Sequence, residues 1–118
     1  EAAKRDVGTG QNQIPDMSYW TKSGSINLNS GWRRTPDGFI EQWGSSSAST
    51  SSSPGAITFP IAFPNAALSI QLTEKTGTGL GGNVCSWGLA DNTLTKTGAS
   101  VICTSPTTET CFFRAIGY

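Results

Sequence analysis

The 118-residue sequence contains no histidine and few charged side chains. Without histidine, no Ser-His-Asp or Cys-His catalytic arrangement can form within one chain. Charged residues make up only 14% of the sequence, the formal net charge is zero, and no run of Lys or Arg occurs. These absences exclude the electrostatic pattern of a protein that binds nucleic acid or an anionic membrane. Any ligand is therefore expected to be neutral, or to be recognised by shape and hydrogen bonds.

Long apolar runs are also missing. No stretch approaches the roughly 20 apolar residues that a membrane-spanning helix needs, so we expect no membrane insertion. No signal peptide is visible, and the first residue is Glu1 rather than Met. We therefore expect a fragment of a longer protein, in which case the missing targeting signal carries no information about the parent.

The cysteines are three in number, Cys85, Cys103 and Cys111. An odd number argues against a simple disulfide framework, and the favoured interpretation is buried free thiols that pack as small hydrophobic side chains. A bridge between Cys103 and Cys111 stays open. Because no Cys-x-x-Cys pair accompanies the lack of histidine, we expect no metal site and no cofactor. The eight carboxylates show no spacing typical of the facing pair in a glycosidase, so we predict no enzymatic activity.

Gly, Ser, Thr and Asn are abundant instead, and they favour short strands and turns over helices. The predicted strands cover residues 25–29, 32–34, 39–43, 57–63, 68–72, 84–87, 101–103 and 111–118. Pro36-Asp37-Gly38 predicts a tight turn between the second and third strands. Pro60 predicts an edge strand or a bulge. The serine-rich stretch 44–55 has nothing to bury and is predicted to be a mobile loop.

This series of seven or eight short strands predicts an all-β fold, an antiparallel β-sandwich. Residues 1–23 are predicted to form an extended linker, and residues 24–118 to form the β domain. The apolar strand that runs to the last residue, Tyr118, predicts a C-terminus pinned within the fold. So small and polar a domain buries little core, and oligomerisation would supply further burial.

Three ordered segments resemble the C-terminal domain of phage tail fibre proteins of the gp53-like group. They are Gly-Trp-Arg-Arg-Thr-Pro-Asp-Gly-Phe-Ile-Glu-Gln-Trp-Gly over residues 31–44, residues 57–65 continuing into 68–72, and Phe-Arg-Ala-Ile-Gly-Tyr over residues 113–118. Residues 5–17 resemble the linker that joins such tips to the fibre shaft. The resemblance implies a homotrimeric knob at the distal end of the tail fibre of a virion assembled in the host cytoplasm. It also implies binding to a receptor on the bacterial surface.

The poorest match covers residues 76–112, a region that such fibres vary, and specificity is expected there. Loops 76–82 and 104–109 are predicted to contact the receptor, with Trp87 as an aromatic platform for a sugar. The alternative for Trp87 is a buried aromatic side chain. The candidate ligand-binding residues are Trp87, Asn83, Ser86, Gly79, Thr107 and Thr108.

The hairpin residues Trp32, Arg33 and Arg34 with Trp43 could hold sugars or phosphates through stacking and forked hydrogen bonds. The favoured alternative places both tryptophans in the core or at a trimer axis and the arginines in solvent or in ion pairs. The residues expected to build the core or the trimer are Trp32, Trp43, Phe59, Phe63, Phe113, Ile116 and Tyr118.

The leading functional hypothesis is a receptor-binding tip of a phage, prophage or phage-like tail fibre. Its partner would be lipopolysaccharide, another surface glycan or an outer-membrane protein, bound non-covalently. A second hypothesis is a structural cap that trimerises the fibre while the receptor site lies elsewhere. A third is a polysaccharide depolymerase, and a distant fourth is a monomeric secreted lectin.

Overall fold

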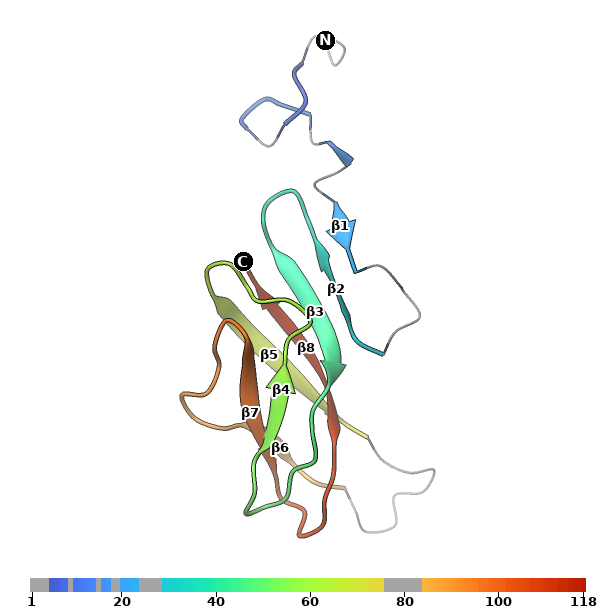
Figure 1. Ribbon diagram of the computed structural model, residues 1–118, viewed down its shortest axis with the longest axis vertical. Coiled ribbons are helices and arrows are strands. Elements are labelled where there is room, and N and C mark those ends of the chain that lie inside the picture. The colour runs from blue at the N-terminus through green and yellow to red at the C-terminus, as the bar shows by residue number, and fades with distance from the viewer. Residues whose placement is uncertain (1–4, 9, 15, 18–19, 24–28, 76–83) are drawn as a thin grey trace.

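The computed structural model describes residues 5–8, 10–14, 16–17, 20–23, 29–75 and 84–118. These residues form eight strands and no α-helix (Figure 1). The strands are β1 (Thr21–Lys22), β2 (Gly31–Arg34), β3 (Ile40–Ser45), β4 (Gly55–Thr58), β5 (Ala67–Glu74), β6 (Trp87–Leu89), β7 (Gly98–Cys103) and β8 (Cys111–Gly117). In the part of the chain so described, no helix is long and apolar enough to cross a membrane.

The strands form two antiparallel sheets that face each other. The larger sheet has the order β1-β2-β3-β8-β5, and the smaller has the order β4-β7-β6. Every pairing between these strands is antiparallel. The predicted all-β antiparallel sandwich is therefore confirmed.

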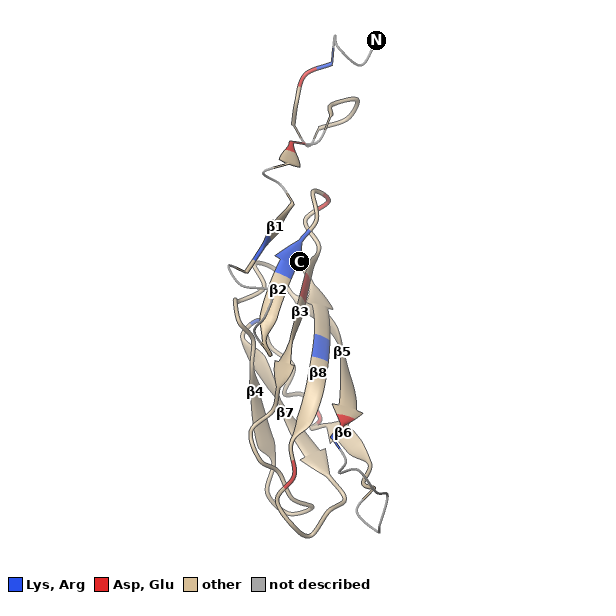
Figure 2. Ribbon diagram, turned by 90° about the vertical axis from the view of Figure 1, so that its right-hand side faces the viewer, with Lys and Arg blue, Asp and Glu red and all other residues tan. Residues whose placement is uncertain are grey.

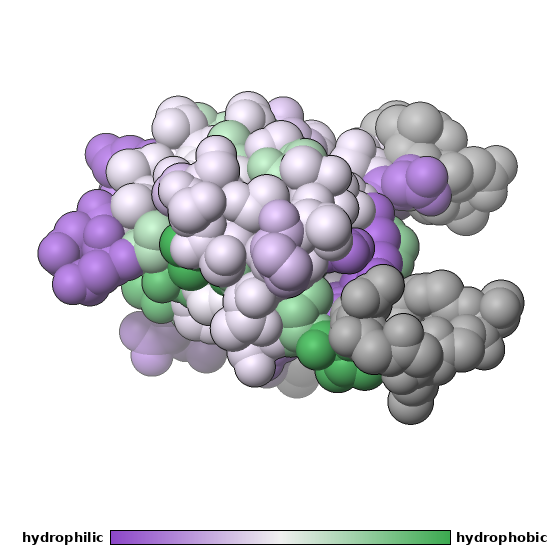
Figure 3. Space-filling model, turned by 90° about the horizontal axis from the view of Figure 1, so that it is seen from below, coloured by the Kyte–Doolittle hydropathy of each residue, from purple (hydrophilic) through white to green (hydrophobic). Residues whose placement is uncertain are grey.

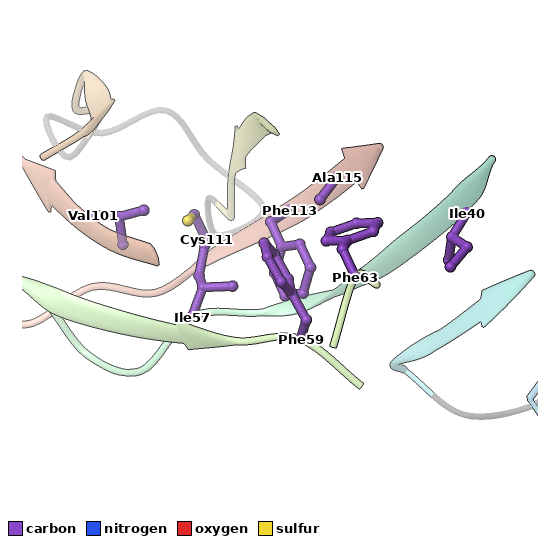
Figure 4. Close-up of a cluster of buried hydrophobic side chains, with 8 residues drawn as sticks. All are labelled: Ile40, Ile57, Phe59, Phe63, Val101, Cys111, Phe113 and Ala115. Carbon is purple, nitrogen blue, oxygen red and sulfur yellow. The ribbon is translucent and has the colours of Figure 1, made fainter. Parts of the chain in front are cut away.

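The hydrophobic core lies between the two sheets (Figure 4). Its centre is a set of three aromatic rings, in which the Phe59 ring centroid lies 5.1 Å from that of Phe63 and 5.8 Å from that of Phe113. Aromatic pairs at such distances add to the stability that burial supplies. The other buried members are Ile40, Ile57, Val101, Cys111 and Ala115. Cys103 and Cys111 are separate buried thiols, and Cys85 is a half-buried free thiol.

The predicted hairpin is confirmed, with β2 and β3 paired from Gly31–Trp43 to Arg34–Ile40. The Gly38 N–H donates to the Thr35 carbonyl at 3.0 Å, and the Phe39 N–H donates to Asp37 Oδ1 at 3.2 Å. Gly38 has a φ of +92°, a conformation that side chains with a Cβ disfavour. Pro, Asp and Gly thus act as their positions in the sequence predict.

β8 is an interior strand of the larger sheet, next to the edge strand β5, and pairs with both β3 and β5. Its residues alternate strictly between buried and exposed, as expected for a strand with one face on the core. The Tyr118 N–H donates to the Ala66 carbonyl at 3.0 Å, and the Tyr118 carbonyl accepts the N–H groups of Asn65 and Ala66. The prediction of a pinned C-terminus is confirmed.

The strand predicted over residues 57–63 was wrong beyond residue 58, because β4 ends at Thr58, two residues before Pro60. β4 is an edge strand, as Pro60 indicated. β5 begins at Ala67, but its register shifts between Ala67 and Ser69. This irregularity leaves Leu68, predicted to face the core, exposed on the surface.

The prediction for the serine-rich stretch 44–55 was wrong. Ser46 and Ser49 are buried, and Ser49 is only 1% exposed. The Ser49 hydroxyl donates to the carbonyls of Val101 and Ser53 at 3.2 and 3.1 Å. These small polar side chains are satisfied by backbone groups distant in sequence, which a composition-based prediction cannot see.

Three strand boundaries also differ from prediction. β6 begins at Trp87, because residues 84–86 are not in a strand, and β7 begins at Gly98, which was predicted to lie in a polar connection. β1, within the range predicted as linker, pairs with β2. The strand predicted over residues 25–29 falls almost wholly outside the described residues.

Candidate functional site

Three segments meet at the end of the sandwich opposite the N-terminal segment (Figure 1). We call this surface, made of the described residues 46–54, 84–86 and 104–110, the loop end. Ser49 and Glu109 exchange two backbone hydrogen bonds of 2.8 and 3.0 Å, and the Ser51 N–H donates to the Ser105 carbonyl at 2.7 Å. The serine-rich stretch therefore packs along the predicted receptor-contacting loop 104–109.

The third segment joins through Ser86 and Thr104. The Ser86 N–H donates to Thr104 Oγ1 at 3.0 Å, and the Thr104 N–H donates to the Ser86 carbonyl at 3.1 Å. Ser86, Thr107 and Thr108 are exposed. Three of the six candidate ligand-binding residues thus lie on one end of the molecule. Gly79 and Asn83, with most of loop 76–82, lie outside the described residues.

Short-range hydrogen bonds fix the shape of the loop end. Thr50 Oγ1 accepts the N–H groups of Ser52 and Ser53 at 3.3 and 3.1 Å. The Thr107 N–H donates to Ser105 Oγ at 3.1 Å. Such hydroxyl-to-backbone bonds are typical of ordered turns. The hydroxyls are consequently presented on a defined surface.

The loop end carries little charge. Seen end-on, its described surface is mostly pale, the colour of residues of intermediate hydropathy (Figure 3). Exposed hydroxyl groups are provided by Ser51, Ser52, Ser53, Thr104, Thr107 and Thr108. Hydroxyls both donate and accept hydrogen bonds, as the hydroxyls of a sugar do. The surface is therefore chemically suited to a neutral glycan.

Trp87 lies beneath this surface and is only half exposed. Its side chain packs against the hydrophobic core, opposite Cys103 on β7. The indole Nε1 is buried and has no hydrogen-bond partner among the described residues. This environment fits the alternative prediction, in which Trp87 is a buried aromatic side chain. It leaves only part of the indole ring accessible.

Glu74 and Cys85, which flank residues 75–84, are linked by hydrogen bonds to the Glu74 carboxylate. Its Oε1 accepts both the backbone N–H of Cys85 at 2.8 Å and the Cys85 thiol at 3.1 Å. The hydrogen bond to Glu74, aided by burial and the Glu74 charge, raises the pKa of Cys85 to about 12. Cys85 therefore stays a protonated, unreactive thiol near neutral pH.

The hairpin residues separate onto two sides of the larger sheet. Trp32 packs against the core, whereas Trp43 lies over Gly31 on the opposite side. A Cβ at Gly31 would lie 2.7 Å from Trp43 Cζ2, so the ring needs a glycine there. Arg33 Nη2 lies 3.1 Å from Glu41 Oε2, so Arg33 forms an ion pair as the favoured alternative expects.

Sequence reasoning missed the third member of this ion cluster. Arg114 Nη2 lies 2.8 Å from Glu41 Oε1, so one carboxylate holds two guanidinium groups. Partial burial raises the pKa of Glu41, but the hydrogen bonds and charges of Arg114 and Arg33 outweigh it and lower that pKa below its ordinary value. The signal was the strict alternation of residues 111–117, which sets Arg114 on the face away from the core.

Sequence reasoning also missed that residues 46–54 belong to the loop end. The signal was the spacing of every second residue along β3, in which the inward positions of Ile40 and Gln42 are continued by the small residues Gly44 and Ser46.

Within the described ranges, no group of three or more Cys, Asp or Glu side chains is placed to hold a metal ion.

Comparison with known families identifies the fold. The family described as "Putative tail fiber protein gp53-like, C-terminal" matches residues 34–118, most of the chain and every strand from β3 to β8. The chain belongs to this family. As a tail fibre C-terminal domain, it has the all-β architecture that the resemblance implied.

Solved structures of pyocin tail fibres share this architecture. A P. aeruginosa R2 pyocin fibre is 27% identical, with a TM-score of 0.67 over 83% of this chain and 26% of that chain. An R1-type pyocin tail fibre is 23% identical, with a TM-score of 0.57 over 83% of this chain and 86% of that chain. The tail fibre domain thus spans about a quarter of the R2 fibre chain that it matches. No curated protein matches the chain.

Proposed function

We propose that this tail fibre domain is a receptor-binding tip that adheres non-covalently to a bacterial surface glycan such as lipopolysaccharide. The observation that carries the proposal is the loop end, where three segments distant in sequence form one ordered surface rich in hydroxyls. This surface lies opposite the N-terminal segment, through which a longer fibre chain would continue (Figure 1). Loops on a rigid scaffold are common carriers of recognition.

The proposal includes a homotrimer at the distal end of the fibre in a phage or phage-like particle. The 12.4 kDa chain exposes 7612 Å², whereas a compact monomer of its mass exposes about 6,100 Å². Part of the excess belongs to the N-terminal segment. Three identical tips multiply weak single-site binding into useful avidity. No chemical step is part of this function.

The test is adsorption of the fluorescently labelled chain to a panel of bacterial strains with different surface glycans. We expect saturable binding to a subset of strains and competition by the glycan purified from a bound strain. The double variant T107A/T108A should bind about tenfold more weakly, because it loses two hydrogen bonds of about 0.7 kcal/mol each.

The matched control is T58A/T97A, which removes two exposed hydroxyls at the other end of β4 and β7. It should bind as the unmodified chain does. Binding to no strain, or equal binding by T107A/T108A, would contradict a receptor site at the loop end. The structural-cap hypothesis would then be favoured, because the uncovered face of the larger sheet offers a surface for association.

A further inference from the structure

The larger sheet has one face on the core and one face that the described strands and loops leave largely open. At one end of the open face, Lys75 Nζ lies 4.1 Å from the Phe112 ring centroid and donates to Ser45 Oγ at 2.8 Å. Directly opposed residues of paired strands share a face, so the registers identify the uncovered side. We call it the outer face. Its residues are Lys22, Arg33, Glu41, Trp43, Ser45, Ser69, Gln71, Thr73, Phe112, Arg114 and Ile116.

Apolar and aromatic side chains occupy the middle of the outer face. Phe112 and Ile116 on the interior strand β8 are 45% and 42% exposed, and Trp43 on the neighbouring β3 is half-buried. At the end of β8, the exposed rings of Tyr118 and Phe39 lie 6.4 Å apart. In a sheet that faces water these central positions are usually polar.

Polar side chains occupy the margins instead. The edge strand β5 contributes Ser69, Gln71 and Thr73, and Lys22 lies on the opposite edge strand β1. An apolar and aromatic centre with a polar rim is the arrangement of protein–protein interfaces, where Arg is also enriched. The outer face shares these features, but Arg114 lies within the apolar centre, between Phe112 and Ile116 on β8 and opposite Trp43. Arg33 lies nearer the margin on β2.

The charges on the outer face suit a protein partner better than a sugar. Figure 2 shows Lys and Arg on β1, β2 and β8 and an acidic residue on β3. Glu41 binds both Arg33 and Arg114, with N···O distances of 3.1 and 2.8 Å. Each guanidinium keeps further N–H donors, so the cluster can bind carbonyl or carboxylate groups of an opposing chain. A hollow of about 290 Å³ beside Arg114, lined also by Ser69 and Gln71, offers space for such groups.

Further exposed apolar side chains lie beyond the sandwich, along the long axis of the molecule. The N-terminal segment extends from β1 past the sandwich (Figure 1). Its exposed apolar side chains are Val7, Ile14, Met17 and Trp20. A partner that covers both the outer face and this segment must itself be long and lie alongside, which is the shape of a second copy of the chain.

From this arrangement we propose that the outer face is the surface through which copies of this chain pack against one another. The inference rests on the proposed homotrimer, and it names the interface that the homotrimer uses. The Arg33–Glu41–Arg114 cluster is then a subunit contact, and the loop end stays free for the receptor. Around a three-fold axis, each copy presents its outer face to its neighbours along the length of the domain.

The test compares two variants by analytical ultracentrifugation of the full chain. Ile116→Glu puts a carboxylate into the centre of the outer face, where burial without a partner disfavours association. Ile102→Glu makes the same substitution at a half-buried position on the side of β7 that faces away from the core. We expect I116E to sediment as a folded monomer and I102E to stay trimeric, with circular dichroism confirming that both fold.

A photo-crosslinker provides a second readout that does not depend on the stability of a variant. Benzoylphenylalanine at position 112 replaces an exposed aromatic of the outer face, and the control places it at exposed Ala56 on β4. Irradiation should give covalent dimers and trimers from position 112 and none from position 56.

The outcomes separate this inference from the proposed function. A trimer that crosslinks from position 56 and not from 112 keeps the homotrimer but overturns the interface. An unmodified chain that sediments as a monomer overturns both. If I116E stays trimeric but no longer adsorbs to bacteria, the outer face is a receptor surface and the inference is overturned.

Discussion

Gln42 is fully buried between the sheets, and both ends of its amide are paired. Its Nε2 donates to the Ile61 carbonyl at 2.8 Å, and its Oε1 accepts the Ile61 N–H at 3.0 Å. The pair ties β3 to the irregular segment that follows β4, where Pro60 has ended the strand. A buried polar side chain is tolerated here because its donor and its acceptor both have partners.

Gln42→Leu should therefore destabilise the domain although it makes the core more apolar. The Ile61 N–H and carbonyl lose their partner, at a cost of about 2 kcal/mol in the free energy of unfolding. Urea denaturation at fixed chain concentration measures the change. Asn65→Leu, which also replaces a side-chain amide by leucine but at an exposed position between β4 and β5, serves as the control. Equal stability of the two variants would show that the Gln42 pair contributes little.

At the scale of strands and turns, the sequence was informative wherever the signal was local. Pro36-Asp37-Gly38 predicted the hairpin, and the apolar run of residues 111–118 predicted β8, because the signals of turn chemistry and of burial lie in adjacent residues. Residues 44–55 gave the opposite result. Their serines are ordered by partners such as Val101 and Glu109, which no local pattern reveals.

The pairing of β8 on both of its sides makes its last residues essential. Ala115 and Gly117 are buried, and residues 115–117 pair with both β3 and β5. Deleting residues 115–118 should therefore give an insoluble chain with no cooperative thermal transition. Tyr118→Ala, which keeps the backbone hydrogen bonds to Ala66, should stay folded. A soluble truncated chain with an unchanged melting temperature would contradict the role assigned to β8.

At the scale of the whole molecule, the two surfaces differ in how far the sequence predicted them. The loop 104–109 was predicted from its composition, but its union with residues 46–54 and 84–86 depends on long-range pairing. The outer face was predicted only in part. Trp43 and Ile116 were expected to build the core or the trimer, but the cluster of Arg33, Glu41 and Arg114 was not predicted, because these residues meet only when β8 inserts beside β3. A neutral chain with few charges can therefore still concentrate several of them on one face.

The proposed function requires that residues 24–118 carry the receptor specificity of a tail fibre. The most direct measurement exchanges these residues between two fibres that carry such a domain and adsorb to different strains, and then records which strains each particle adsorbs to. We expect adsorption to follow residues 24–118, and T107A/T108A in the exchanged domain to weaken that adsorption. Adsorption that stays with the remainder of the fibre would contradict the proposed receptor-binding function and leave the domain as a structural cap.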